Sequence, residues 1–222
     1  MYIYGAGGHS KVVRDILKSK DTYIDGIFDD SQLKEIAEGF RPERNIDPAD
    51  YPPFSSLKQP LIICIGNNVT RALTDKRLEG GVYGQAIHPT AIIASDVKIG
   101  EGTVVMHGAV IQTGSTIGRH VIINTSATID YDNTVGDYAH ISPKAVLCDH
   151  VSIGEGTHVG SAAIVLPQIK VGKWCVVGAG AVVIRDLPDF TIAVGNPARI
   201  LVEKSLVHKM QHVFNPKAAH NS

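Results

Sequence analysis

The sequence lacks the features that place many chains in a class at once. It has only three cysteines, an odd number without a Cys-x-x-Cys pair, so neither a disulfide framework nor a cysteine metal site is expected. A formal net charge of −1 provides no basic surface for nucleic acid or an anionic membrane. No apolar run approaches the ~18 residues that span a bilayer, and the opening residues, MYIYGAGGHS, do not resemble a secretion signal. We therefore expect a cytoplasmic protein without nucleic-acid or membrane partners.

What the sequence does contain is a six-residue repeat. From Ile87 to Val183 every sixth residue is a branched aliphatic, without a gap, and the residue four places later is usually small. A period of six fits neither an amphipathic helix nor an alternating strand. It is typical of a parallel β-helix, in which each short strand-and-corner unit gains its core only from neighbouring coils.

The repeat also predicts which residues lie above one another. If three hexapeptides make one triangular coil, residues 18 apart stack, so His140 and His158 should lie together on one outer face. Tyr131 and Asp132 should lie on a corner. Glycines are frequent in the corners, and we expect them there because tight turns favour positive φ.

Ahead of the repeats, the pattern of strand, glycine turn, helix and strand predicts a small parallel α/β unit. We expect an α/β domain over residues 1–84 and a β-helix over residues 85–200. Residues 201–222 should form a tail with a short helix.

Six motifs in this order are similar to those of a known family. They are YGAGGHSKVV at 4–13, FDD at 28–30, IGNN at 65–68, INTSATIDYDNTVGDYAHISP at 123–143, VGAGAVV at 177–183 and VGNPA at 194–198. The chain resembles the hexapeptide-repeat acyltransferases, and within them the sialic acid O-acetyltransferases and UDP-4-amino-sugar N-acetyltransferases. The resemblance implies a mainly β fold, a left-handed parallel β-helix with a small N-terminal Rossmann-like α/β domain. It also implies a homotrimer, with active sites between adjacent prisms, and acetyl-CoA as co-substrate.

The N-terminal glycine turn is the expected substrate site. A strand that runs through glycines into a helix directs backbone N–H groups at a phosphate. Ser10 stands where a dinucleotide fingerprint has its third glycine, so that fingerprint is not matched. The resemblance implies that this turn holds a UDP-sugar; the alternative is a βαβ unit that only covers the first coil. The implied substrate-binding residues are Gly7, Gly8 and His9 on the diphosphate side, Asp29 and Asp30 at the uracil or ribose, and Gly66 through its backbone.

The acetyl-CoA site is implied in the same way. The matching positions are His140, Ser161 and Ala179. Basic side chains towards the C-terminal coils either contact the CoA phosphates or are simply solvated, and these are Lys170, Lys173, Arg185 and Arg199.

The catalytic position departs from the family pattern. The family motif has an acid, a histidine base and a second acid, whereas this chain has Asp130, Tyr131 and Asp132. A tyrosine with its ordinary pKa near 10 is only about one part in a thousand ionised at pH 7. Tyr131 and Asp132 are therefore the expected catalytic residues, but the usual mechanism does not transfer to them directly.

Three interpretations of this departure remain open. Asp132 or water accepts the proton from a partly neutral amine while Tyr131 donates a hydrogen bond, with positioning supplying most of the rate. Alternatively, His107 or His140 replaces the base. The third possibility is a protein that binds nucleotide sugar or CoA with little or no turnover.

The expected function is acetyl-CoA-dependent N-acetylation of the amino group of a UDP-linked amino-deoxysugar for bacterial surface glycans. The alternatives are O-acetylation of a sialic acid or another sugar, which demands a stronger base, or a catalytically weak binding protein. No metal site is expected, because the histidines do not follow the pattern of the zinc-binding hexapeptide enzymes.

Overall fold

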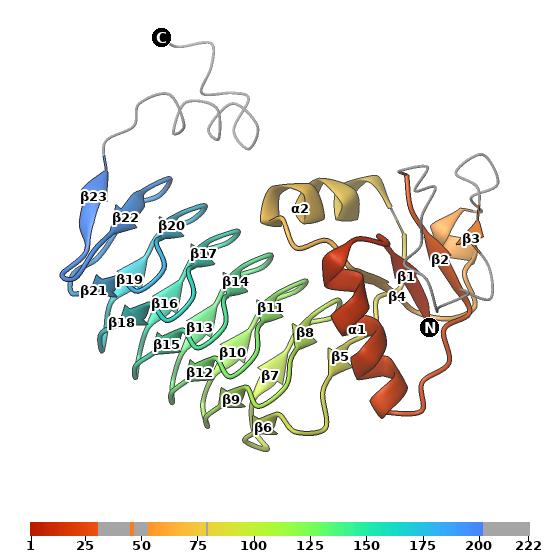
Figure 1. Ribbon diagram of the computed structural model, residues 1–222, viewed down its shortest axis with the longest axis horizontal. Coiled ribbons are helices and arrows are strands. Elements are labelled where there is room, and N and C mark those ends of the chain that lie inside the picture. Colours follow the sequence, from red (N-terminus) through yellow and green to blue (C-terminus); the bar gives the residue numbers. More distant parts are fainter. Residues whose placement is uncertain (31–44, 47–52, 79, 202–222) are drawn as a thin grey trace, which may run out of the picture.

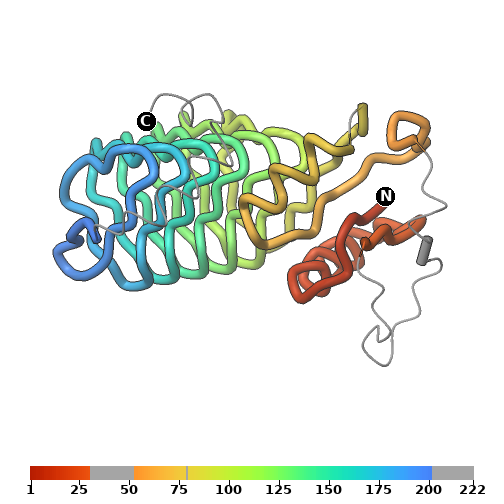
Figure 2. The backbone as a smooth tube through the Cα atoms, turned by 90° about the horizontal axis from the view of Figure 1, so that it is seen from above, coloured from red at the N-terminus to blue at the C-terminus, as the bar shows by residue number. Residues whose placement is uncertain are grey.

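The computed structural model describes residues 1–30, 45–46, 53–78 and 80–201. Figure 1 shows a long prism of stacked coils with a smaller α/β unit at its N-terminal end. Figure 2 shows the coils one behind another, with the N-terminal strands and first helix beside the earliest coils. Apart from Leu201, the predicted tail with its short helix lies outside the described residues.

The N-terminal unit is built on a parallel sheet whose strand order is β3-β2-β1-β4. Its strands are β1 (Tyr2–Tyr4), β2 (Gly26–Phe28), β3 (Asn45–Ile46) and β4 (Leu61–Ile63), and its helices are α1 (Gly8–Ser19), the 3-10 turn η2 (Phe54–Ser56) and α2 (Asn68–Arg77). Val13, Ile16 and Leu17 form the buried stripe of α1, at helical spacing. Within the described residues, no helix has the length and apolar character that a membrane crossing requires.

The prism consists of three parallel sheets of very short strands, which follow one another around each coil. One contains β5 (Ala86–Ile87), β8 (Val104–Val105), β11 (Ile122–Ile123), β14 (His140–Ile141), β17 (His158–Val159), β20 (Val176–Val177), β22 (Ile192–Val194) and the antiparallel β23 (Arg199–Leu201). The second contains β6 (Ile92–Ile93), β9 (Val110–Ile111), β12 (Thr128–Ile129), β15 (Val146–Leu147), β18 (Ile164–Val165) and β21 (Val182–Val183). The third contains β7 (Lys98–Ile99), β10 (Thr116–Ile117), β13 (Thr134–Val135), β16 (Ser152–Ile153) and β19 (Lys170–Val171).

We name these sheets after their strands as the β14 sheet, the β12 sheet and the β13 sheet. Partners in every parallel pair of the prism up to β21 are 18 residues apart, as Ile123 and Ile141 illustrate. The second residue of each short strand points inward, and from Val105 to Val183 all these residues are buried in one core. This confirms the predicted fold class, a mainly β chain with a parallel β-helix and a small Rossmann-like α/β unit.

Positive φ, which we expected at the corner glycines, is found at only some of them. Gly156 and Gly180 have positive φ, but Gly154 does not, and histidine and aspartate adopt positive φ at His150 and Asp132. A Cβ on Gly154 would lie 2.5 Å from the backbone of Gly172 in the next coil. Close approach between stacked coils, rather than φ, is therefore what requires glycine at such positions.

A buried arginine joins the two parts of the chain. Arg71 of α2 donates hydrogen bonds to the carbonyl oxygens of Ile65 (2.9 Å) in the N-terminal unit and of His120 (2.8 Å) and Tyr138 (2.7 Å) in the prism. Burial, its largest influence, lowers the pKa of Arg71 to about 9, so the guanidinium is still charged at neutral pH. A buried charge is tolerated only when it is well paired, so these acceptors hold α2 against the coils.

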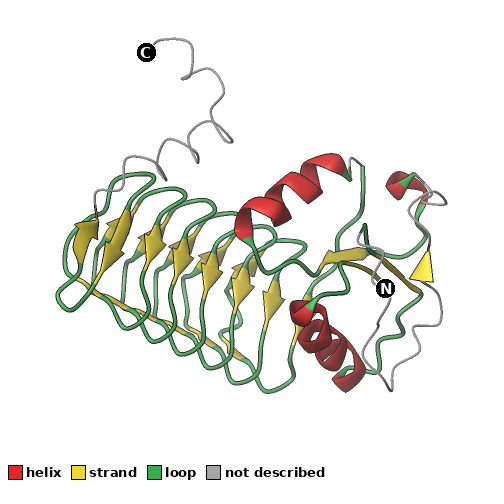
Figure 3. Ribbon diagram, turned by 45° about the horizontal axis from the view of Figure 1, so that its top comes forward, coloured by secondary structure: helices red, strands yellow, loops and turns green. Residues whose placement is uncertain are grey.

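Apolar packing supports the same junction. The outward side chains of Val104 and Ile122, on the β14 sheet, are buried with α1 residues such as Ile16 in one cluster. Figure 3 shows α1 lying beside the first coils. The predicted boundary at residue 84 thus falls between two parts that share buried surface, and it stays a prediction.

We predict that Gly154→Ala destabilises the protein more than Gly180→Ala. The first change places a Cβ against backbone, which costs about 2 kcal/mol or more. At Gly180 a Cβ would meet nothing within 4 Å, so only the positive φ opposes it, at about 1 kcal/mol. Urea unfolding of both variants measures the difference, and equal or reversed losses would contradict the close-approach explanation.

Candidate active site

A pocket of about 250 Å³ lies at the carboxyl ends of β1, β2 and β4. Parallel sheets place ligand sites where the chain leaves neighbouring strands and the strand order reverses, as it does on either side of β1. The pocket is lined by Tyr4, Gly5, Gly7, Gly8, His9, Asp29, Asp30, Cys64, Ile65 and Gly66. The structure therefore brings together all the residues that the sequence predicts for substrate binding.

The glycine turn leaves open space in front of the first helix. Gly7 is the N-cap of α1, and no side chain caps that end. A Cβ built on Gly7 or Gly8 would meet nothing within 4 Å, so these glycines are not required by packing. Uncapped N–H groups at a helix N-terminus attract anions, and the free space allows a phosphate to approach them.

The two aspartates have partners that fix the pocket. The Asp29 carboxylate accepts a hydrogen bond from the backbone N–H of Ala6 and so holds the glycine turn. Asp30 forms an ion pair with Arg77 of α2, at 2.5 Å, beside the Tyr4 hydroxyl. Asp29 is half-buried and Asp30 exposed, so an outer carboxylate oxygen can still meet a ligand.

His9 contributes a buried ring nitrogen to the pocket residues. Its Nε2 atom is buried and has no hydrogen-bond partner among the described residues, although it lines the pocket. Burial, followed by the charge of Arg71, lowers the pKa of His9 to about 4, so the imidazole is neutral at pH 7. A neutral, unpartnered imidazole in a pocket is available to a ligand.

The predicted stack of His140 on His158 is confirmed, with ring centroids 4.8 Å apart and planes within 2°. The Asn124 amide lies 3.0 Å from Nε2 of His140. Burial first, and then positive groups led by His158 and Arg71, lower the pKa of His140 to about 3. His140 is therefore a neutral side chain near the domain junction rather than an open surface histidine.

The other predicted cofactor residues lie further along the prism. Ser161 and Ala179 are exposed and occupy equivalent positions on successive corners after the β14 sheet, where the carbonyl oxygen of Ser161 accepts from Gly180. Lys170 and Lys173 line a separate pocket with Asp186 and Asp189, at the corner after the β13 sheet. The two lysines are thus not placed beside Ser161 and Ala179, and the carboxylates offset their charge.

Tyr131 and Asp132 lie on a third edge, the corner after β12. The Tyr131 side chain is 41% exposed. The charge of Asp149 is the first of the causes that raise the pKa of Tyr131, ahead of desolvation and two further carboxylates. The structure does not bring this pair together with His140 within one chain, because β14 belongs to a different sheet.

A buried asparagine that the sequence reasoning missed holds this corner. Asn133 is 1% exposed, and its side-chain N–H groups donate to the carbonyl oxygens of Asp130 (2.7 Å) and Cys148 (2.9 Å). Its side-chain oxygen accepts from the N–H of Val151 in the next coil. The sequence signal that could have identified Asn133 is an asparagine at an inward position of the repeat, where most other coils have a small or aliphatic residue.

His120 is a corner residue that contacts the second helix. It is fully buried, with Nε2 3.3 Å from Oδ1 of Asp75 on α2. Burial opposes ionisation of Asp75, but the close contact with His120 and the hydrogen bond from the Tyr138 hydroxyl outweigh it and lower the carboxyl pKa. This network holds α2 on the prism.

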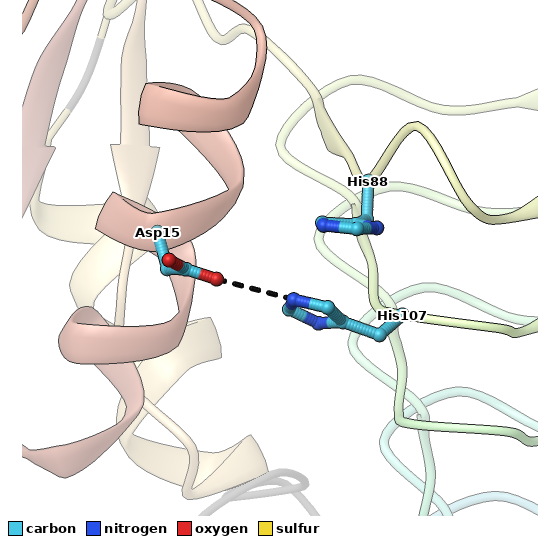
Figure 4. A group of neighbouring side chains, drawn as sticks. All are labelled: Asp15, His88 and His107. Carbon is cyan, nitrogen blue, oxygen red and sulfur yellow. Dashed lines mark hydrogen bonds and ion pairs between the residues drawn. The ribbon is translucent and has the colours of Figure 1, made fainter.

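Figure 4 shows a cluster of one carboxylate and two imidazoles between the first helix and the prism, formed by Asp15, His88 and His107. Nε2 of His107 lies 3.1 Å from Asp15 of α1, and the two imidazole rings stack with centroids 3.6 Å apart and planes 26° apart. Imidazole lone pairs lie in the ring plane, so closely stacked rings do not direct both nitrogens at one ion. The group instead ties α1 to the first coils, and His107 lies on a different edge of the prism from Tyr131.

We predict that acidification destabilises the fold. His9, His140 and His158 have pKa values lowered chiefly by burial. Between about pH 4 and their ordinary 6.5, the unfolded chain binds more protons than the folded chain. The free energy of unfolding therefore rises with pH in this window, by up to ~1.4 kcal/mol per pH unit for each imidazole.

Urea unfolding at pH 7 and pH 5 tests this prediction. His140→Asn should reduce the pH dependence, whereas Ser152→Asn, an outward change without a titrating group, should leave it unchanged. Equal pH dependence in native protein and His140→Asn would contradict the assigned burial.

Comparison with known proteins agrees with this geometry. Residues 1–78 match the family model described as the PglD N-terminal domain. Residues 96–131 and 150–185 match the model described as bacterial transferase hexapeptide (six repeats).

Two solved structures cover most of the chain. One is a mutant of perosamine N-acetyltransferase from Caulobacter crescentus with CoA and GDP-perosamine, 35% identical, with a TM-score of 0.80 over 91% of this chain and 96% of that one. The other is the acetyltransferase domain of PglB from Neisseria gonorrhoeae FA1090 with acetyl coenzyme A, 36% identical, with a TM-score of 0.80 over 90% of this chain and 98% of that one.

A curated relative is UDP-N-acetylbacillosamine N-acetyltransferase of Bacillus subtilis (strain 168), 42% identical over 109 residues, which are 47% of this chain. The match spans 50% of that relative's length. Together with the two structures and the two family models, it shows that the chain belongs to the hexapeptide-repeat sugar N-acetyltransferases with a PglD-type N-terminal domain.

Proposed function

We propose that this protein transfers the acetyl group of acetyl-CoA to the amino group of a UDP-linked amino-deoxysugar, in the synthesis of bacterial surface glycans. The observation that carries the proposal is the pocket at the carboxyl ends of β1 and β4, which gathers the predicted nucleotide-sugar residues. Relatives of this chain are named as acetyltransferases of UDP-linked and GDP-linked amino sugars, and two of them are solved with CoA or acetyl-CoA.

In this proposal the diphosphate lies against Gly7 and Gly8, where the helix N-terminus is uncapped. Asp29 and Asp30 face the base and ribose, and the free Nε2 of His9 meets an oxygen of the substrate. His140, Ser161 and Ala179 remain the proposed contacts for acetyl-CoA. The three cysteines are free thiols, which fits a reducing cytoplasm, where we place the reaction.

Association of three copies completes the proposed site. The outward positions of the β13 sheet are polar, whereas those of the β12 sheet are apolar except at Thr128, namely at Ile92, Val110, Val146, Ile164 and Val182. A mainly apolar sheet face of this kind is typical of an interaction surface. We propose that copies of the chain cover it in a cyclic trimer, which brings the Tyr131 corner of one copy beside the nucleotide pocket and His140 of another.

We predict that the protein releases free thiol from acetyl-CoA when it is given a UDP-linked amino sugar, with an N-acetyl product by mass spectrometry. Gly8→Val should raise the dissociation constant for UDP at least about tenfold, because it fills space that packing leaves open. Lys18→Val, on the exposed far end of the same helix, is the matched control and should bind UDP normally. Turnover of GDP-linked sugars alone, an O-acetyl product, or normal UDP binding by Gly8→Val would refute this assignment.

We predict that Ile164→Glu converts the trimer into monomers, because it places a charge in the centre of the apolar face. Thr134→Glu, at the corresponding outward position of the polar β13 sheet, should leave the trimer intact. Light scattering after gel filtration measures both masses. A native protein that is monomeric, or a trimer that survives Ile164→Glu but not Thr134→Glu, would contradict the proposed interface.

A further inference from the structure

The residue at the family's base position cannot serve as the base. Tyr131 occupies that position, and the carboxylates around it, with Asp149 first, raise the pKa of its hydroxyl further above neutral pH. The proposed reaction still requires that a proton leave the attacking amine.

The next coil places a histidine against this corner. His150 lies 18 residues after Asp132, at the same corner position, and both residues have positive φ. The backbone N–H of His150 donates to the carbonyl oxygen of Tyr131 at 3.2 Å. The two rings meet edge to face, with centroids 5.5 Å apart and planes at 86°.

The His150 imidazole lies between two carboxylates. Its Nδ1 atom is 3.2 Å from Oδ2 of Asp149, and its Nε2 atom is 3.5 Å from Oδ2 of Asp132. A carboxylate oxygen accepts, so in the neutral tautomer with the proton on Nδ1 the first contact is a hydrogen bond and the Nε2 lone pair lies on the side of Asp132. The side chains of His150 and Asp132 are 53% and 52% exposed, so the space beside Nε2 is open.

From this geometry we propose that His150 is the general base of the reaction and that it replaces the histidine missing at Tyr131. The inference rests on the proposed acetyl transfer. Asp132 is still the acidic residue beside the base, as in the family motif. The imidazole that acts as the base comes from His150 in the following coil. An amine nitrogen about 3 Å from both Asp132 Oδ2 and His150 Nε2 donates one hydrogen to each.

The chemical step then balances. The amine nitrogen forms a bond to the thioester carbonyl carbon, and the bond from that carbon to sulfur breaks. His150 Nε2 takes the proton that the nitrogen loses and passes it to the departing CoA thiolate, directly or through water, which returns the imidazole to its neutral form. The products are the N-acetyl sugar and free CoA thiol.

The surroundings favour His150 over the other candidate bases. The charged groups that face it are Asp132 and Asp149, and the coil beyond contributes the uncharged Gln168. His107 is paired with Asp15 on another edge of the prism. His140 is half-buried, with a strongly lowered pKa, beside the Asn124 amide.

The test compares His150→Asn with native protein in the thiol-release assay. Asparagine tolerates positive φ, so the corner backbone is preserved. We expect kcat/KM to fall about 100-fold or more, with the UDP dissociation constant unchanged. Gln168→Asn, the equivalent position one coil further on, controls for backbone effects and should keep native activity. Tyr131→Phe should change activity only a few-fold, because the hydroxyl is not the base.

A rescue variant separates a chemical role from a structural one. The double variant His150→Asn with Tyr131→His returns an imidazole to the family position beside Asp132, and we expect it to regain at least about tenfold over His150→Asn. Native-like turnover by His150→Asn, or loss of activity in Tyr131→Phe but not in His150→Asn, would overturn the role of His150 alone. No thiol release by native protein with any nucleotide-linked amino sugar would overturn the proposed function, and this role with it.

Discussion

The stacking of residues 18 apart is the constraint on which the rest of the structure depends. Each short strand pairs in parallel with the strands one coil before and after it, and its inward aliphatic packs on the same position of those coils. Because the backbone repeats so closely, the corners must also stack, and corner side chains form vertical columns. The neighbours of a functional corner residue are therefore the residues 18 positions before and after it. Asp132 and His150 are one such pair.

A second requirement is the attachment of the N-terminal unit to the prism. Arg71, with acceptors on both sides, and the buried pair of Asp75 and His120 hold α2 against the coils. Apolar residues of α1 cover Val104 and Ile122. This attachment holds the unit with the proposed nucleotide pocket on the first coils, while the corner with Tyr131 lies on another edge of the same chain. The proposed acetyl transfer therefore uses the pocket of one copy and the corner of another, and the proposed trimer brings the two together.

The fold could be predicted from the sequence because a branched aliphatic residue recurs at every sixth position without a gap. The meeting of the proposed substrate-binding residues in one pocket could also be predicted, because residues that follow neighbouring parallel strands meet at one end of the sheet. The environment of His120 could not, since its burial depends on the docking of α2 through Asp75. The need for glycine at Gly154 was assigned to φ, whereas only the coordinates show how near the backbone of the next coil lies. The approach of His150 to Asp132 could also have been predicted, because the two residues are 18 apart and therefore lie one coil apart.

The most direct measurement is a crystal structure of the assembled protein with CoA and a UDP-linked amino sugar. The account predicts that the nucleotide occupies the pocket of one copy. The sugar nitrogen should then lie within about 3.5 Å of Nε2 of His150 from a neighbouring copy. A sugar nitrogen that faces any other base, or a nucleotide bound away from Gly7 and Gly8, would contradict it.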